Sequence, residues 1–204
     1  MNAISVSAVE RTDLGKTGVK KTRAQGLIPA IVYGNKTPQS IAVNKSDVRG
    51  LIFTPDFKIA EVNIDGNVER CILKEYQCHP VTEEILHIDF LRLKDGVDVK
   101  VDIPVRFKGT SPGVKLGGKL QQQMRKVRIK TTPEKLIDEV IVDISHLELG
   151  DVLRVKDIDV AKSIEIMVNE SNPLATVEIP RALKSAAAAE DKAAKAADKK
   201  AAAQ

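Results

Sequence analysis

Five basic residues fall close together near the start of the chain: Arg11, Lys16, Lys20, Lys21 and Arg23, with Asp13 as the one acid among them. If residues 16–25 form a helix, Lys16, Lys20 and Arg23 recur at i, i+4 and i+7 and share one face. A row of cations on a short helix suits a polynucleotide backbone, because Lys and Arg neutralise phosphates. A solvated basic helix without a partner has the same pattern, so both interpretations stay open on charge alone.

Residues 85–93 form the second stretch whose side chains could bind a ligand. The alternation predicts a strand that turns His87 and Asp89 to the face opposite Ile88 and Phe90. A carboxylate there can accept hydrogen bonds from base amino or imino groups, or meet an RNA-bound magnesium ion. An imidazole can donate to a phosphate or stack on a base. A single His on a strand more often has only a structural role.

Two segments are distinctive enough to compare with known families. They are VERTDLGKTGVKKTRAQGLIPAIVYG, which contains the basic stretch, and QCHPVTEEILHIDF, from Gln77 to Phe90. Both resemble the bacterial large-subunit ribosomal proteins that bind 5S rRNA, whose longer members are also known as the general stress protein CTC. Weaker likeness in GGKLQQQ and LELGDVLRV extends the resemblance over roughly residues 3 to 180.

The resemblance implies a 5S rRNA site in the N-terminal part of the chain. Carried over position by position, the RNA-binding residues are Arg11, Lys16, Lys20, Lys21, Arg23, Tyr33, Lys74, His87 and Asp89. The sequence departs from the family at two places, because Val19 stands where relatives often carry Ser and Lys74 where some carry Gln. The implied partners are 5S rRNA and the large ribosomal subunit, and the free protein is expected to be a monomer.

Composition agrees with a cytoplasmic protein rich in β-structure. The 204 residues are 43% hydrophobic but only 3% aromatic, without Trp, so the core must be built from Val, Ile and Leu, which favours sheet. Two cysteines do not make a secreted disulfide scaffold, and no signal peptide or membrane-length apolar run is recognisable. We therefore expect reduced thiols and no membrane association.

Residues 1–93 are expected to form the 5S rRNA-binding domain, a small β-barrel of about six strands with two short helices. The second helix is predicted over 47–53, with Ser46 as its N-cap. Asp65-Gly66 between two apolar runs is a strong hairpin signal. The predicted strands are 3–10, 28–33, 40–43, 58–64, 68–76 and 85–93.

Residues 94–180 are expected to form a second, all-β domain, which makes the fold mainly β. Pro104 inside its first strand predicts an edge position. Residues 106–130 contain eight cations and no acid, and alternation puts Lys126, Arg128 and Lys130 on one exposed face. We expect that face to contact rRNA outside the 5S site, with a merely solvated face as the alternative. Residues 181–204, rich in Ala and Lys, are expected to be a disordered or transiently helical tail.

Two motifs invite other functions. Gly113–Lys119 fits the start of a phosphate-binding loop, but Leu120 replaces the Ser or Thr that would hold Mg²⁺, and a strand is predicted to follow instead of a helix. Cys71 and Cys78 lack the spacing of a zinc site and should lie on opposite faces of one strand. We expect no cofactor, no metal and no catalysis. The rival functions are a stress-induced RNA-binding factor acting partly off the ribosome and a nucleotide-hydrolysing enzyme built on Gly113–Lys119.

Overall fold

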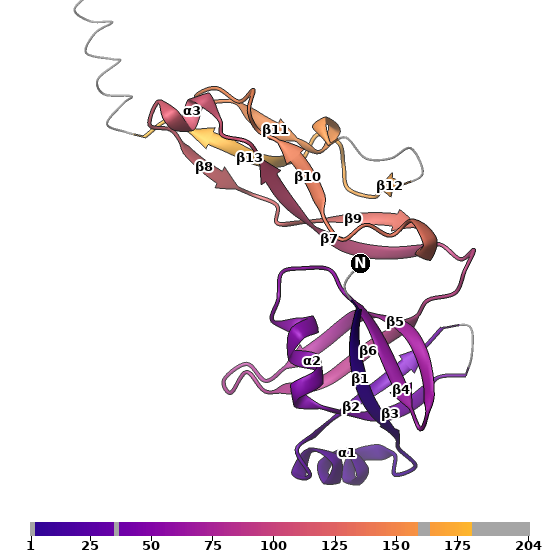
Figure 1. Cartoon of the computed structure of the whole chain (residues 1–204). Coiled ribbons are helices and arrows are strands. Elements are labelled where there is room, and N and C mark those ends of the chain that lie inside the picture. The colour runs from indigo at the N-terminus through magenta and orange to yellow at the C-terminus, as the bar shows by residue number, and fades with distance from the viewer. Residues whose placement is uncertain (1–2, 35–36, 159–163, 181–204) are drawn as a thin grey trace, which may run out of the picture. The chain divides into compact units, whose positions relative to one another are not determined.

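The structure is a computed structural model that describes residues 3–34, 37–158 and 164–180 (Figure 1). The chain divides into two compact units, the first made of residues 1–104, 126–140 and 160–167, and the second of residues 105–125, 141–159 and 168–204. In the described ranges no helix has the length and apolar character needed to cross a membrane. The tail predicted for residues 181–204 lies outside the described residues.

A closed barrel of six strands is the main feature of the first unit, as the sequence predicts. Around the barrel the order is β1-β3-β2-β6-β5-β4, with β1–β4 and β2–β6 parallel and the other neighbours antiparallel. Closure leaves no unpaired strand edge, which suits a small β-domain. The strands are β1 (Ala3–Glu10), β2 (Leu27–Tyr33), β3 (Gln39–Asn44), β4 (Ile59–Ile64), β5 (Asn67–Cys78) and β6 (Ile85–Arg92).

Inward-facing side chains of these strands fill the barrel. Phe90, Ile88, Ile41 and Val32 are completely buried in one hydrophobic cluster. The β4–β5 hairpin turns at Asp65 and Gly66, which both have positive φ, 48° and 95°. The predicted Asp-Gly turn is therefore confirmed, and it fixes the register in which Ile64 pairs with Asn67.

Two helices connect the strands, as predicted. Helix α1 (Gly15–Ala24) lies across one end of the barrel, and α2 (Lys45–Ile52) packs on β1 and β3 (Figure 1). The expected N-cap of α2 is wrong, because the helix begins after Asn44 and the cap has no side-chain hydrogen bond. Asp47 instead accepts a hydrogen bond from the backbone N–H of Ser7 at 3.2 Å, which ties the first turn of α2 to β1.

A four-stranded sheet follows the barrel in sequence, in the order β10-β7-β9-β12. Val99, Val101 and Ile103 are buried, so alternate residues of the first strand in this domain face the core. The edge position predicted from Pro104 is wrong, because β7 lies between β10 and β9. Pro104 occupies the last residue pair of the β7–β9 ladder, where a missing N–H interrupts little pairing. The strands are β7 (Val99–Lys108), β9 (Lys126–Thr131), β10 (Val140–Asp143) and β12 (Glu165–Ile166).

The second unit contains a three-stranded sheet, β11 (Val152–Arg154), β13 (Pro173–Glu178) and β8 (Lys119–Gln122). The glycine-rich segment before β8 forms the one-turn helix α3 (Pro112–Lys115), capped by Ser111. Buried Ser111 also donates a hydrogen bond from Oγ to the carbonyl of Leu147 at 2.5 Å. A phosphate-binding loop must be followed by a helix, whereas Gly113–Lys119 leads into the strand β8, as predicted. The nucleotide-hydrolysing alternative therefore has no support in the fold.

Candidate nucleic-acid interface

Helix α1 carries the basic face. Gly18 faces the loop that precedes the helix, and a Cβ added there would lie 2.2 Å from the carbonyl oxygen of Asp13. Only glycine allows this close packing, which brings the Asp13 carboxylate to 3.2 Å from Lys21 Nζ. Both side chains are largely exposed, so this ion pair adds little stability but reduces the local positive charge.

The two remaining lysines of the predicted face, Lys16 and Lys20, are exposed and form no ion pair with the described residues. Arg23 behaves differently, because its Nη2 donates a hydrogen bond to the carbonyl of Leu86 at 2.7 Å. This contact joins the last turn of α1 to β6. The two segments singled out in the sequence, the basic stretch and residues 85–93, are therefore in direct contact.

The outer face of β6 holds the predicted pair. His87 Nδ1 lies 2.8 Å from Asp89 Oδ1, and each side chain is about one-third exposed, at 34% and 32%. In the parallel ladder Tyr33 of β2 pairs with Leu91, two positions after Asp89. In the antiparallel ladder Glu75 and Gln77 of β5 pair with Asp89 and His87. The face therefore runs from α1 along β6 toward Tyr33.

Tyr33 lies in an acidic environment at the end of this face. Burial first, and then the nearby charges of Asp89 and Glu75, raise the pKa of the Tyr33 phenol. The hydroxyl therefore stays protonated at neutral pH and can donate a hydrogen bond as well as accept one. Two carboxylates beside a phenol accept hydrogen bonds from base amino and imino groups, whereas they repel phosphates.

Sequence reasoning missed Glu75 and Gln77. The β5–β6 ladder shifts register between Leu73 and Glu75, so simple alternation along β5 does not place these side chains. Their cross-strand pairing with a predicted site residue becomes visible only in the folded ladder.

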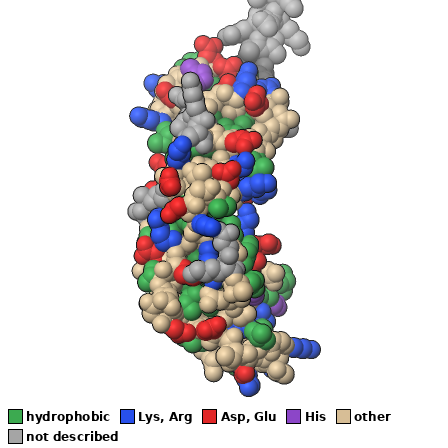
Figure 2. All heavy atoms as spheres, turned by 90° about the vertical axis from the view of Figure 1, so that its right-hand side faces the viewer, with side chains coloured by type: hydrophobic (Ala, Val, Ile, Leu, Met, Phe, Trp, Pro, Cys, Tyr) green, Lys and Arg blue, Asp and Glu red, His purple; other side chains and the backbone are tan. Residues whose placement is uncertain are grey.

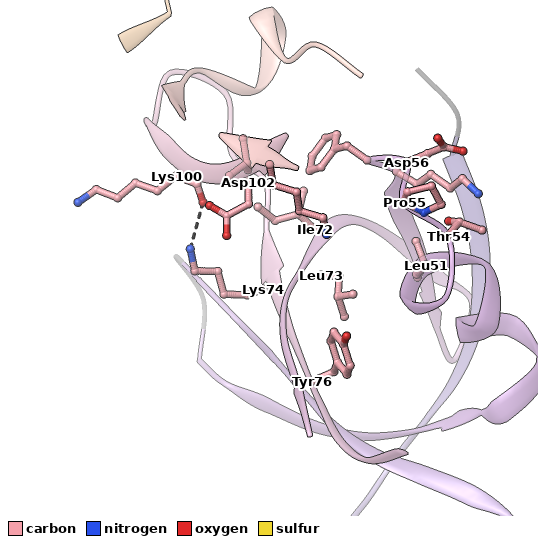
Figure 3. Close-up of a pocket in the computed structure, with 14 residues that line it drawn as sticks. Leu51, Thr54, Pro55, Asp56, Ile72, Leu73, Lys74, Tyr76, Lys100 and Asp102 are labelled. Atoms are coloured by element: carbon pink, nitrogen blue, oxygen red, sulfur yellow. Dashed lines mark hydrogen bonds between the residues drawn. The ribbon is translucent and has the colours of Figure 1, made fainter. Parts of the chain in front are cut away.

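Two predicted contacts lie apart from this face. Lys74, at the register shift, donates from Nζ to the carbonyl of Lys100 at 3.0 Å and points toward Asp102 in a pocket that Tyr76 also lines (Figure 3). Arg11 follows β1, and its backbone N–H donates to Ser40 at 2.9 Å. The Nε and Nη1 atoms of Arg11 are buried and have no hydrogen-bond partner among the described residues.

Acids from other segments accompany the cations of β9. Arg128 Nε and Nη2 donate to the Asp102 carboxylate at 2.7 and 3.1 Å, and this hydrogen bonding is the main cause that lowers the pKa of Asp102. Lys130 Nζ lies 3.2 Å from Asp98 and 3.5 Å from Glu165. Figure 2 shows basic and acidic side chains interspersed over the face in view. The count of eight cations without an acid in residues 106–130 therefore does not describe the charge of the folded surface.

The two cysteines lie on opposite faces of one strand, as expected, and His79 stabilises a turn. Cys71 is buried and Cys78 exposed, as expected for opposite faces of β5, and burial is the main cause that raises the pKa of the Cys71 thiol to about 12. His79 Nδ1 accepts hydrogen bonds from the N–H groups of Val81 and Thr82 at 3.3 and 3.2 Å, which shapes the β5–β6 turn. In the part of the chain that the structure describes, no three His, Cys, Asp or Glu side chains are grouped to hold a metal ion.

Comparison with known proteins finds a matching family model for each half of the chain. The family model described as the Ribosomal L25p family matches residues 6–90, and the model described as Ribosomal protein TL5, C-terminal domain, matches residues 98–181. Three similar relatives are each called large ribosomal subunit protein bL25. The protein of Cytophaga hutchinsonii is 38% identical over 189 residues, 93% of this chain and 98% of that protein. Those of Amoebophilus asiaticus and Phocaeicola vulgatus are 35% and 30% identical, over 92% of this chain in both cases and 95% and 98% of the relatives.

Similarity at this level over nearly the full length of both partners confirms the resemblance found in the sequence. It also agrees with the expectation of a ribosomal protein and not an enzyme. The chain belongs to the bL25 family of ribosomal proteins, in its long form with an L25p domain followed by a TL5 C-terminal domain.

Proposed function

We propose that this protein is a structural constituent of the large ribosomal subunit, located on the cytoplasmic ribosome, and that it binds 5S rRNA through residues 1–93. The relatives' shared name supports the first part. The second part rests on the surface formed by α1 and the outer face of β6. We call it the RNA face and define it by Lys16, Lys20, Tyr33, His87 and Asp89.

The observation that carries this proposal is the hydrogen bond from Arg23 to the carbonyl of Leu86. It places a cationic helix directly beside an acceptor-rich strand face. Protein–RNA contacts divide into backbone contacts, which position the complex, and base contacts, which give specificity. Lys16 and Lys20 suit the first task, and Asp89 and Tyr33 suit the second.

Such a face fits a wide, shallow RNA groove better than a phosphate ridge. In A-form RNA the minor groove exposes base edges and 2′-hydroxyls, which donate hydrogen bonds to carboxylates. Phosphates lie on both sides of that groove, within reach of lysines on a neighbouring element. We infer that α1 contacts the backbone while β6 faces the base edges of 5S rRNA.

Arg11 adds a second supporting observation. Leaving two guanidinium donors buried without acceptors costs stability, because hydrogen bonds to water are lost and not replaced. Unpaired donors of this kind often mark a position that a ligand or a rearrangement completes. Arg11 lies between β1 and α1 in the chain. We propose that its guanidinium gains acceptors when RNA binds beside α1.

The second domain is proposed to extend the contact with the large subunit. Its basic strand β9 has less free charge than the sequence suggests, because Arg128 and Lys130 are ion-paired. Lys126 is exposed and forms no ion pair with the described residues. Any additional rRNA contact of the Lys126, Arg128 and Lys130 face is therefore expected to depend mainly on Lys126.

Binding and sedimentation together test the proposal. The full chain should bind 5S rRNA at physiological salt about tenfold more tightly than an unrelated structured RNA of the same length. It should also co-sediment with large subunits in near one-to-one amounts. Equal affinity for both RNAs would contradict the 5S site. Specific binding with only a trace on the subunits would favour the stress-induced factor that acts partly off the ribosome.

A further inference from the structure

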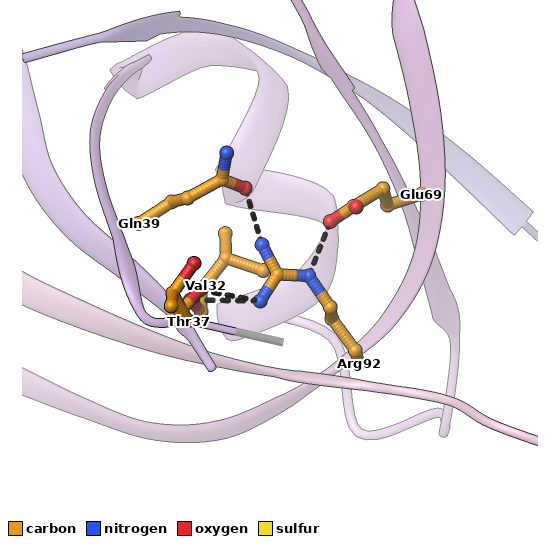
Figure 4. Close-up of polar contacts among 5 residues, drawn as sticks. All are labelled: Val32, Thr37, Gln39, Glu69 and Arg92. Carbon is orange, nitrogen blue, oxygen red and sulfur yellow. Dashed lines mark hydrogen bonds and ion pairs between the residues drawn. The ribbon is translucent and has the colours of Figure 1, made fainter. Parts of the chain in front are cut away.

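A charged side chain lies inside the barrel, at the end of β6. Arg92 is only 9% exposed, and each of the three nitrogen atoms of its guanidinium has at least one acceptor (Figure 4). Nε donates to the Glu69 carboxylate and Nη2 to the side-chain oxygen of Gln39. Nη1 donates to the carbonyls of Val32 and Thr37, both at 3.3 Å. A single side chain thus connects β6 with β5, β3 and the end of β2.

Arg92 also contacts the backbone on both sides of Tyr33. Val32, the residue before Tyr33, supplies one of the carbonyl acceptors. Gly34, the residue after it, has φ of 144° and packs on the Arg92 backbone, so that an added Cβ would lie 3.1 Å from Arg92 Cβ. Arg92 therefore fixes the backbone around Tyr33, although Arg92 is buried and is not part of the proposed RNA face.

The position of Tyr33 needs such support. Tyr33 is the last residue of β2 and belongs to the last residue pair of the β2–β6 ladder, so strand pairing ends at this point. Ends of strands open more readily than their middles, because fewer backbone hydrogen bonds hold them. A recognition side chain at such an end must be fixed by something else if it is to be preorganised for binding.

We propose that Arg92 is a positioning residue for RNA recognition: by clamping the end of β2 it keeps the Tyr33 side chain against Asp89 and Glu75. The inference rests on the proposed function of the RNA face. It assigns to Arg92 a role that neither its burial nor its charge would indicate alone. A buried Arg–Glu pair is weak evidence for stability as such, but it can specify a unique local arrangement.

The double variant Arg92→Met, Glu69→Leu tests the proposal. Removing both partners avoids leaving one buried charge uncompensated, so the barrel should still fold, as circular dichroism and thermal unfolding will show. The exposed Arg70→Met variant, which loses a cation from the neighbouring strand, is the control. All variants are made in a Tyr76→Phe background, since Tyr33 and Tyr76 are the two tyrosines of the chain.

Two readouts are needed. In the free protein, titration of the Tyr33 phenol should give a pKa closer to the ordinary tyrosine value than in the parent protein, because the ring becomes less buried and moves away from the two carboxylates. Affinity for 5S rRNA should fall by roughly tenfold, comparable with the loss of one base contact. Affinity for unrelated RNA should stay the same, because Lys16 and Lys20 are untouched.

A folded double variant that keeps either the Tyr33 pKa or the 5S affinity of its parent would overturn the positioning role. If the double variant does not fold, Gln39→Leu removes one acceptor and leaves the Arg92–Glu69 pair intact; it should change both readouts in the same direction but less. If neither variant folds, Arg92 serves stability only, and the proposal is wrong. Absence of 5S specificity in the parent protein would instead contradict the proposed function, and the titration of Tyr33 would still report whether Arg92 fixes its position.

Discussion

At the scale of single residues, the RNA face combines side chains with opposite preferences. Asp89 and Glu75 make the β6 end of the face negative. Burial first, and then these same charges, raise the pKa of Tyr33. Lys16 and Lys20 on α1 are positive and exposed. A partner that fits both must offer hydrogen-bond donors beside anions, and an RNA groove does so because base edges lie between two rows of phosphates.

Replacing Asp89 by Asn should reduce specificity without harming the fold. The side chain is about one-third exposed, so the substitution leaves no cavity, and the partly exposed contact with His87 contributes at most about 1 kcal/mol. An amide replaces one carboxylate oxygen with a donor, which should weaken 5S binding by about 1–3 kcal/mol. Filter binding measures this effect, with Glu61→Gln on β4 as the control for the loss of one negative charge. Equal weakening in both variants would mean that long-range charge matters and not the position of Asp89.

Replacing Gly18 by Ala should disrupt the packing between α1 and the loop that precedes it, and so lower the stability of the protein. An added Cβ would collide with the backbone of Asp13, so the loop or the helix must move. Forcing extra atoms into such a close contact typically costs about 1–3 kcal/mol. Urea unfolding measures the loss, and Thr17→Ala at the preceding exposed position should change stability far less. A Gly18→Ala variant as stable as the parent would show that the loop before α1 is not held as described.

At the scale of elements, α1 and β6 were predictable because their signals are local. Glycines and the i, i+4, i+7 spacing of cations indicated α1, and strict alternation indicated that His87 and Asp89 share a face. The cap of α2 was predicted wrongly, since Asp47 bonds to Ser7 on another strand, a contact that local sequence does not reveal. Glu75, Gln77 and Arg92 were missed for a similar reason: a register shift and a buried charge both depend on partners distant in sequence.

Neutralising the exposed lysines of α1 should change the salt dependence of binding. For Lys16→Gln, Lys20→Gln, the slope of log K against log salt should fall by about 1.4 to 1.8, because each lost phosphate contact contributes about 0.7 to 0.9. The matched control, Lys45→Gln with Arg49→Gln on α2, removes two exposed cations away from the RNA face. Reduced affinity with an unchanged slope would show that the lysines of α1 do not contact phosphates.

The basic strand β9 should contribute little to subunit binding. Arg128 and Lys130 are already paired with Asp102, Asp98 and Glu165, so charge reversal at these two positions mainly breaks ion pairs within the protein. Because those pairs are exposed to solvent, breaking them should cost the protein little stability. Lys126→Glu should weaken co-sedimentation with large subunits more than the Arg128→Glu, Lys130→Glu pair does. The reverse order would show that the ion pairs open to contact rRNA.

At the scale of the whole molecule, the total charge of a segment predicts the RNA-binding region poorly, and the arrangement of the segments in the fold predicts it better. Net charge is only +4, and the most basic long stretch, residues 106–130, has acids from neighbouring strands beside it once folded. All proposed 5S contacts lie within residues 1–93, and all six barrel strands lie within Ala3–Arg92. We therefore propose that residues 1–93 form a domain that folds and binds on its own, with residues 94–180 as a second domain.

Chemical footprinting of 5S rRNA tests this account most directly, with the full chain and with residues 1–93 compared on the same RNA. Both proteins should protect one contiguous region, in which sugar–phosphate protection depends on Lys16 and Lys20 and base protection depends on Asp89. The two footprints should coincide within a nucleotide. A fragment that folds, as shown by circular dichroism, but leaves 5S rRNA unprotected while the full chain protects it would contradict the account, because the site would then require residues 94–180.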